Sequence, residues 1–71
     1  MVEMYKNGFG VSIIDDGYGS QDGLYELAVI TDDGIHYNNK VTNGDVVGFL
    51  TMEEARKLAD EVKAFDEYKG K

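Results

Sequence analysis

The chain has 71 residues, of which 42% are hydrophobic and 30% charged, and it contains no cysteine. This length allows a single domain, which we assign to residues 1–71. Small domains bury only about 60% of the surface that their unfolded chains expose, so a deep catalytic cavity would compete with the core for apolar atoms. Without cysteine, disulfides, thiolate metal sites and cysteine nucleophiles are excluded. An enzyme is therefore not expected.

The charge is acidic and unevenly distributed. Fourteen acidic residues against seven basic ones give a formal net charge of −7. Between Lys6 and Lys40 there is no basic residue. Lysine and arginine supply the attraction to nucleic-acid phosphates and anionic membranes, so we expect neither as a direct partner. Solubility is the ordinary explanation for such a charge, and an acidic contact surface is the alternative.

The N-terminal sequence lacks the basic start and the apolar stretch of a signal peptide. No run of about 18 apolar residues is present that could span a bilayer. Together with the absence of cysteine, these features predict a cytoplasmic protein.

The first half of the chain carries two strand patterns separated by a loop. In residues 8–15 apolar side chains alternate with smaller or polar ones, which predicts a strand with one buried face. Residues 15–23 contain three glycines and three aspartates and form the longest expected loop. A second strand is predicted over residues 24–31. Both of its faces are largely apolar, which is typical of a central strand.

Asp32-Asp33-Gly34 is expected to close a hairpin through a three-residue loop, in which a type I turn is followed by a left-handed glycine. This loop pairs Thr31 with Ile35 and keeps the apolar residues on one face. A two-residue loop would instead set His36 beside Thr31, which the hydrophobic pattern disfavours. The third strand is then predicted from Ile35 to about Asn39.

Residues 40–50 leave two alternatives open. Asn43-Gly44 is a strong two-residue hairpin signal and would lead into a further strand. Asp45 could equally cap a short helical turn.

The last third of the chain predicts a helix. Thr51-Met52-Glu53-Glu54 is a capping box, the signature of a helix N-terminus. From Met52 to Phe65 apolar residues recur at helical spacing and form a stripe about four turns long. The tail, residues 68–71, is expected to fray. The simplest architecture is therefore α+β: a small antiparallel three-stranded meander sheet, or four-stranded with residues 40–50, packed against one C-terminal helix.

The residues that could support catalysis or ligand binding lack the further residues that such a site requires. His36 is the only histidine, is expected on an exposed strand position, and has no second ligand or nucleophile. Asp15, Asp16 and Asp22 do not have the spacing of a calcium loop. The glycines of the same loop are followed by neither a lysine nor a helix, so they do not form a phosphate-binding loop. We expect no catalytic residue, no cofactor and no metal.

The remaining function is binding to a partner, and the candidate residues for this function lie in loops. Tyr18 lies between two glycines, so its ring either folds back on the sheet or is presented to a partner. The aspartates around it and those of the hairpin turn lie at opposite ends of the second strand, too far apart to share one reaction centre. The candidate partner-binding residues are Asp15, Asp16, Tyr18, Asp22, Asp32 and Asp33.

Three segments carry a resemblance: GFGVSII at 8–14, GLYELAVI at 23–30 and DVVGFLT at 45–51. Over residues 8–62 the chain resembles short uncharacterised proteins encoded by tailed bacteriophages. The resemblance brings no functional residues with it. It implies a phage origin and, through that origin, a protein that occupies a host or defence protein, including as a mimic of the DNA that such a protein binds.

Together these observations predict a non-enzymatic phage accessory protein in the host cytoplasm, which binds a protein partner with a basic surface through its acidic residues. The alternative is a small structural or self-associating phage component, such as a homodimer, whose acidity only keeps it soluble.

Overall fold

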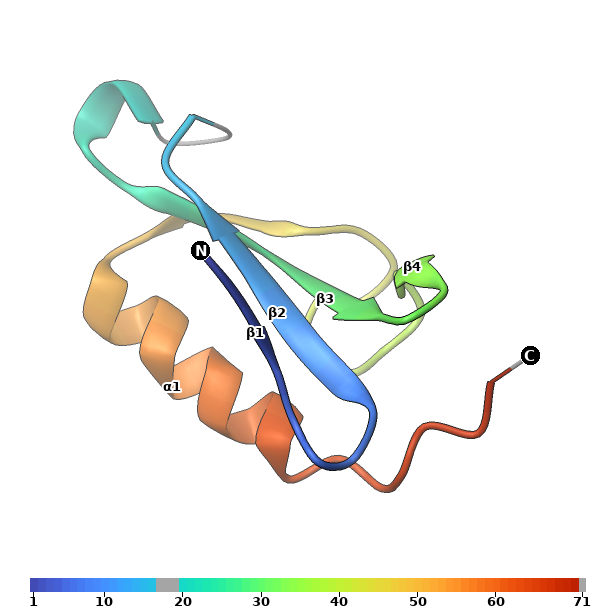
Figure 1. The fold of residues 1–71 in the computed structure, drawn as a ribbon. Coiled ribbons are helices and arrows are strands. Elements are labelled where there is room, and N and C mark those ends of the chain that lie inside the picture. The colour runs from blue at the N-terminus through green and yellow to red at the C-terminus, as the bar shows by residue number, and fades with distance from the viewer. Residues whose placement is uncertain (17–19, 71) are drawn as a thin grey trace.

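Within residues 1–16 and 20–70, which the computed structural model describes, five strands form one antiparallel sheet and one helix covers a face of it (Figure 1). The strands are β1 (Val2–Met4), β2 (Phe9–Ile14), β3 (Tyr25–Thr31), β4 (Gly34–Ile35) and β5 (Val47–Leu50). A short 3-10 helix, η1 (Ser20–Asp22), precedes β3, and α1 (Met52–Lys63) follows β5. The fold is α+β, as predicted, with an antiparallel meander packed against one C-terminal helix.

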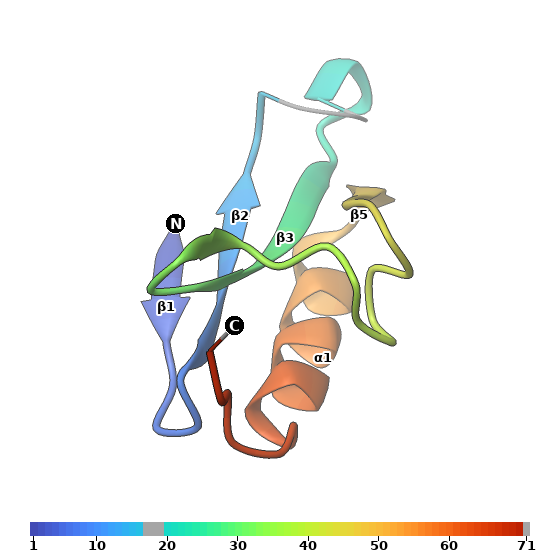
Figure 2. The same ribbon diagram turned by 90° about the vertical axis from the view of Figure 1, so that its right-hand side faces the viewer.

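Strand β3 is central, which confirms the interpretation of its two apolar faces. Along one edge it pairs with β2, from Thr31 opposite Phe9 to Glu26 opposite Ile14. Its other edge is shared, because β4 pairs with its C-terminal end and β5 with its N-terminal end. Figure 2 shows β1 at one side of the sheet and β5 at the other.

Strand β1 was not predicted, and a glycine in β2 makes room for it. Met4 pairs with Gly10, and the backbone bonds from Tyr5 N to the Phe9 carbonyl (2.8 Å) and from Ile13 N to the Met1 carbonyl (2.7 Å) extend the pairing. A Cβ atom on Gly10 would clash with the carbonyl oxygen of residue 3 and lie 2.5 Å from the Met4 sulfur. Only glycine therefore allows the two backbones to approach this closely.

The β3–β4 hairpin has a two-residue loop, Asp32-Asp33, so the predicted three-residue loop was wrong. Gly34 pairs with Thr31, and Ile35 pairs with Ile30. Gly34 has a φ of +111°, which glycine adopts without Cβ strain. The glycine is therefore the first residue of the returning strand, one position later than the loop residue it was expected to be.

His36 occupies the core side, where the predicted register placed Ile35. Its amide donates to the Val29 carbonyl at 2.8 Å. Its ring packs edge to face against Phe9 and Tyr68, with centroids 5.5 and 5.8 Å apart. The expectation of an exposed histidine was therefore wrong. An imidazole that packs as an aromatic ring replaces the aliphatic side chain, and Ile35 is left exposed on the other face.

The third strand ends at Ile35 and does not continue to Asn39 as predicted, because the Asn39 side chain folds the following segment. Its amide donates to the His36 carbonyl and to the Thr42 hydroxyl, both at 2.7 Å. Its Oδ1 accepts from the backbone amides of Val41 and Thr42, both at 2.9 Å. These bonds bend the chain locally and replace the ladder of a strand.

The Asn43-Gly44 turn forms and leads into a strand. Both residues have positive φ, +54° and +95°, and Asp45 N donates to the Thr42 carbonyl at 3.3 Å, as in a type I′ turn. The strand alternative for residues 40–50 is therefore the right one, and no helical turn begins at Asp45. Strand β5 pairs with β3 and not with the segment before the turn.

Helix α1 begins as predicted. The Thr51 hydroxyl accepts from the Glu54 amide at 3.1 Å, and the Glu54 carboxylate accepts from the Thr51 amide at 2.9 Å. The capping box is thus complete. The core lies between α1 and the sheet, and its buried side chains are Phe9, Val11, Ile13, Leu27, Val29, Leu50, Ala55, Ala59 and Val62.

Asn7, in the turn between β1 and β2, holds the far end of α1. Its side-chain amide donates to the carbonyls of Val62 (2.9 Å), Lys63 (3.3 Å) and Phe65 (3.1 Å). Its Oδ1 accepts from the Phe9 amide at 3.0 Å. The last carbonyls of a helix lack intrahelical donors, so this one side chain supplies a cap from the opposite end of the sequence.

The tail was expected to fray from Tyr68, but Tyr68 is anchored. Its amide donates to the Asn7 carbonyl and its hydroxyl to the Asp33 carboxylate, both at 2.7 Å. Its ring packs edge to face on Phe9 with centroids 5.3 Å apart. These partners come from two different turns, so local sequence could not indicate them.

Glu3 links β1 to α1 through an ion pair. Its carboxylate forms a 2.9 Å ion pair with Arg56 and accepts from the Tyr5 hydroxyl at 3.1 Å. The hydrogen bond from Arg56 holds the pKa of Glu3 below its usual value. Burial of the ring, followed by the hydrogen bond to the Glu3 carboxylate, raises the pKa of Tyr5 to about 12.

Tyr5→Phe is expected to flatten the alkaline limb of the stability profile. Because the pKa of Tyr5 is raised in the folded state, its contribution is complete below the unfolded value of about 10 and is lost as pH rises toward about 12. We expect the free energy of unfolding, measured by urea titration at several pH values, to fall less steeply over this window in Tyr5→Phe than in the exposed-site control Tyr37→Phe. Equal slopes in the two variants would contradict the assignment.

Candidate protein-binding surface

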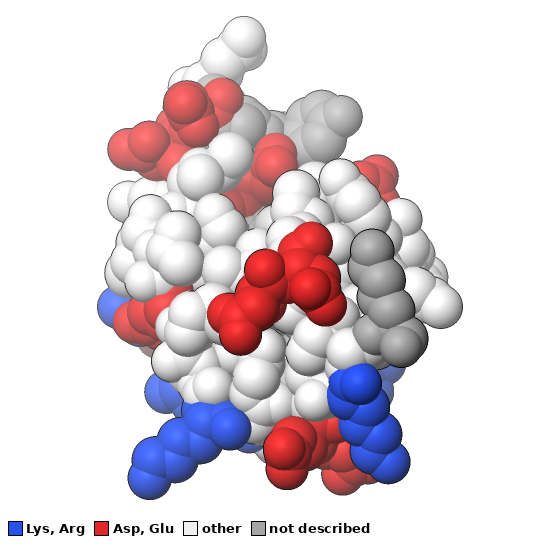
Figure 3. Space-filling view, turned by 45° about the vertical axis from the view of Figure 1, so that its right-hand side comes forward, with Lys and Arg blue, Asp and Glu red and all other residues white. Residues whose placement is uncertain are grey.

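The predicted acidic residues lie in separate places. Asp15 and Asp16 follow β2 and Asp22 ends η1, whereas Asp32 and Asp33 form the β3–β4 loop, at the opposite end of β3. All five are exposed. Figure 3 shows acidic side chains in separate groups with uncharged surface between them. Tyr18 lies outside the described residues. The structure therefore does not bring these candidates together in one compact patch.

One of the candidates has a structural role. Asp33 accepts a hydrogen bond from the Tyr68 hydroxyl at 2.7 Å, and this bond raises the pKa of Tyr68. Asp33 thus helps to hold the C-terminal segment over the core. Asp32, its neighbour in the same loop, is exposed.

The face of the sheet opposite α1 is apolar, and among residues 1–16 and 20–70 no α-helix lies over it. By strand alternation it takes the residues that point away from the core. These residues surround a shallow hollow of about 300 Å³. We call this surface the open face, and it consists of Val2, Ser12, Ile14, Glu26, Ala28, Ile30, Ile35 and Val46.

The open face exposes large aliphatic side chains. Val2 is 63% exposed, Ile35 50% and Ile14 37%. Glu26 is its ionisable residue, and no lysine or arginine lines it in the described part of the chain. Single exposed apolar residues are common on monomers, whereas several that share one face indicate an interaction site. The open face therefore has the composition of an interface centre.

The sequence indicates the apolar outward residues of β3, but it does not predict that they form an exposed apolar face. The apolar outward residues of β3, Ala28 and Ile30, indicate a central strand, and the structure confirms this. Because α1 covers the other side of the sheet, the same pattern also leaves this face of the strand without an α-helix over it in the described part of the chain, with Ala28 9% exposed. Val2 was missed because β1 was missed, although its alternation with Glu3 and Met4 was a weak signal.

The backbone conformation of β5 leaves the Phe49 side chain exposed. Strand β5 has a bulge, because Tyr25 pairs with Leu50 while Leu27 pairs with Val47. The extra residue allows both Val47 and Leu50 to pack against the core. Phe49 is left 61% exposed with a φ of +59°, a conformation that costs a residue with a Cβ about 1–2 kcal/mol. Nothing in the sequence pattern indicated this.

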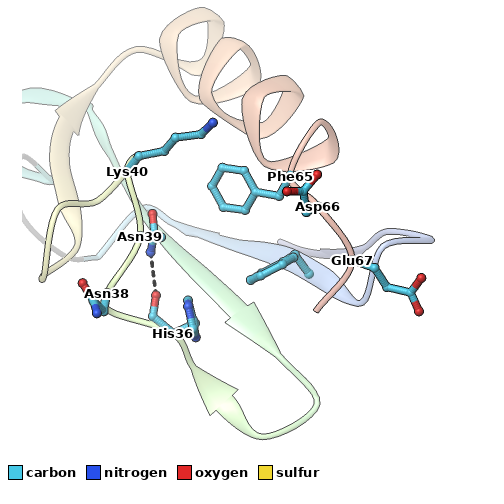
Figure 4. A pocket seen from close by; sticks show the side chains of 8 residues that line it. His36, Asn38, Asn39, Lys40, Phe65, Asp66 and Glu67 are labelled. Carbon is cyan, nitrogen blue, oxygen red and sulfur yellow. Dashed lines mark hydrogen bonds between the residues drawn. The ribbon is translucent and has the colours of Figure 1, made fainter. Parts of the chain in front are cut away.

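A second hollow, of about 370 Å³, lies between the segment after β4 and the segment after α1 (Figure 4). Phe9, His36 and Phe65 supply aromatic surface, and the Lys40 amine points toward Phe65, 5.6 Å from the ring centroid. The side-chain amide of Asn39 is already used within its own loop. No hydrogen bond in the described residues joins the His36 side chain to a nucleophile or a carboxylate.

The described residues form no group of three or more histidine, aspartate or glutamate side chains that could hold a metal ion. Within the same residues, every buried side-chain nitrogen and oxygen has a hydrogen-bond partner, so none points to a ligand. No helix in the described part of the chain has the length and hydropathy needed to cross a membrane. The open face is thus the strongest candidate site.

Comparisons with known proteins identify no relative. No family model matches the chain, and no curated protein and no solved structure matches it significantly. The function therefore has to be inferred from the residues and their geometry.

Proposed function

We propose that this protein is a non-enzymatic binding protein that docks on another protein through the open face. The proposal is supported above all by the gathering of exposed aliphatic side chains, Val2, Ile14 and Ile35, on one side of the sheet. Interfaces commonly have an apolar centre and a polar rim. Here Asp15 and Asp16, which follow β2, and Asp32 of the β3–β4 loop lie at the two ends of the apolar centre.

The class of partner follows from the resemblance to short phage proteins, which supports a host or defence protein in the host cytoplasm. A DNA mimic would need a continuous array of carboxylates. The aspartates of this chain are separated by the open face, so we assign them to the rim of a protein-binding surface. They would attract a partner with basic residues.

Ile35→Lys is expected to weaken capture of the partner about tenfold or more, because it replaces a half-exposed aliphatic side chain of the open face, beside Ile30, with a solvated charge. Ala64→Lys, at the exposed end of α1, is the matched control, since it adds the same charge elsewhere. The measurement is quantitative mass spectrometry of proteins that the immobilised chain retains from bacterial lysate. A partner retained equally by both variants would contradict the proposal.

Self-association is the second candidate function, because the same apolar face could meet its copy. Sedimentation of the purified chain distinguishes the two functions. A dimer that Ile35→Lys abolishes and Ala64→Lys leaves intact, with no other protein retained, would favour a structural component.

A further inference from the structure

We infer that the partner element that fits the open face is an amphipathic helix with lysine or arginine residues near both of its ends. This inference rests on the proposed function and adds the shape and charge of the partner. It is carried by three properties of the open face, which are its dimensions, its missing helical layer and the sign of the charges at its ends.

The dimensions match one helix. The open face follows β3 from Glu26 to Ile30, and at about 3.3 Å per residue these five residues extend about 17 Å. Four strand positions about 4.8 Å apart give a width of about 19 Å. A helix of 14 residues is about 21 Å long and 10–12 Å across, so it fits the width of the open face, and its ends extend just past the apolar residues toward the aspartates. Because α1 already covers the other face, a partner helix would complete the three-layer arrangement in which both faces of a sheet are covered.

The charges select a basic partner and disfavour a second copy. Asp15 and Asp16 directly follow Ile14 at one end of the open face. Asp32 lies in the loop beyond the Ile30–Ile35 pair at the other end. Two copies placed face to face would bring these carboxylates together, with a net charge of −7 on each chain. Lysine or arginine side chains of a partner helix would instead meet a carboxylate at each end.

Because the open face is small, we expect charge to contribute strongly to association with the partner. A face of about 17 by 19 Å offers about 320 Å², less than half of the 800 Å² that each partner contributes to a standard interface. Complexes of this size class are transient, and electrostatic attraction raises their rate of formation. We therefore expect an affinity that decreases as salt increases, because salt screens exposed charges.

Three synthetic 14-residue peptides test the inference on the full chain. The first has leucines on one helical face and lysines elsewhere, the second keeps the leucines and replaces lysine by glutamate, and the third keeps the lysines and replaces leucine by serine. Binding is measured by NMR titration at low salt. We expect the leucine–lysine peptide to bind at least about tenfold more tightly than the other two and to shift the amides of Ser12, Ala28 and Ile30 but not those of α1.

Variants of the chain sharpen the test. Ile35→Lys should weaken binding of the leucine–lysine peptide about tenfold, whereas Ala64→Lys should leave it unchanged. The triple change Asp15→Asn, Asp16→Asn and Asp32→Asn should weaken it and reduce its salt dependence.

The outcomes separate the two levels of the proposal. Equal binding of the leucine–glutamate peptide would overturn the basic partner, and equal binding of the serine–lysine peptide would overturn the apolar contact. If the leucine–lysine peptide fails to shift the open face while lysate capture still depends on Ile35, the helix inference is wrong and the proposed function stands. If capture is unaffected by Ile35→Lys, the proposed function itself fails.

Discussion

Asn7→Asp is expected to lower the free energy of unfolding by about 2–4 kcal/mol, although it changes a single polar atom. The amide of Asn7 donates to three carbonyls at the end of α1, those of Val62, Lys63 and Phe65. A carboxylate has no proton to donate, and it would face three acceptors at the negative end of the helix dipole. Two of these three bonds are partly buried, and removing the donor from such acceptors typically costs about 1–3 kcal/mol, and more where a charge is introduced.

Urea denaturation of Asn7→Asp and of the control Asn38→Asp measures this effect. Asn38 is exposed, so the same chemical change there should cost less than about 0.5 kcal/mol. The deficit of Asn7→Asp should also shrink as pH falls toward about 4, because a carboxyl group that faces acceptors binds a proton more readily in the folded state than in the unfolded chain and can then donate again. If both variants lose the same small amount of stability, Asn7 is not the cap described above.

Gly10→Ala is expected to cost about 2–3 kcal/mol and to detach β1. The added methyl group would clash with the backbone of residue 3 and with the Met4 side chain, so the two strands must separate. Amide exchange should accelerate at Tyr5 and Ile13, which donate to carbonyls across the β1–β2 pair, while the helix amides keep their protection.

Gly23→Ala is the control for this change. Gly23 has a φ of +73° but open space around the position of its Cβ, so alanine there should cost only about 1 kcal/mol of backbone strain. Loss of protection spread evenly over the whole chain in Gly10→Ala would argue against a local separation of β1.

Elements that depend on neighbouring residues could be predicted, and those that depend on distant ones could not. The start of α1 is set by Thr51 and Glu54, three residues apart. The alternation in β2 and β3 is equally local. By contrast, β1 exists because Gly10 leaves room for it, and Tyr68 is anchored by Asn7 and Asp33. Tyr68 is at least 35 residues away from either partner, so no short window of sequence contains both members of these pairs. The fit of Gly10 against residues 3 and 4 lies within a few residues, but it becomes visible only once the two strands are paired.

The hairpin register failed for a different reason. The prediction assigned the core position by hydrophobicity and therefore preferred Ile35 to His36. In the structure the imidazole packs against both Phe9 and Tyr68, so the decisive property was an aromatic ring and not an aliphatic side chain. The same error concealed the candidate site, because it placed Ile35 on the core side and away from the open face.

The aspartates illustrate what sequence can say about a surface. Their separation by the length of β3 followed directly from their positions in two connections of the chain. The apolar surface between them could not be predicted, because the sequence does not tell which face of the sheet the helix covers. That choice is made by packing of Ala55, Ala59 and Val62 against the opposite side.

Because Phe49 has a left-handed conformation, selection for stability and selection for function should favour different residues at this position. A glycine at this position would relieve the strain of about 1–2 kcal/mol, and an asparagine would tolerate the conformation better than a phenylalanine does. A library of variants sorted only for resistance to heat or protease should therefore drift away from phenylalanine at position 49. A library sorted for the natural activity of the chain would retain it if the exposed ring contributes to that activity. Comparing the two enrichments at this one codon would show what the ring contributes without knowledge of the partner.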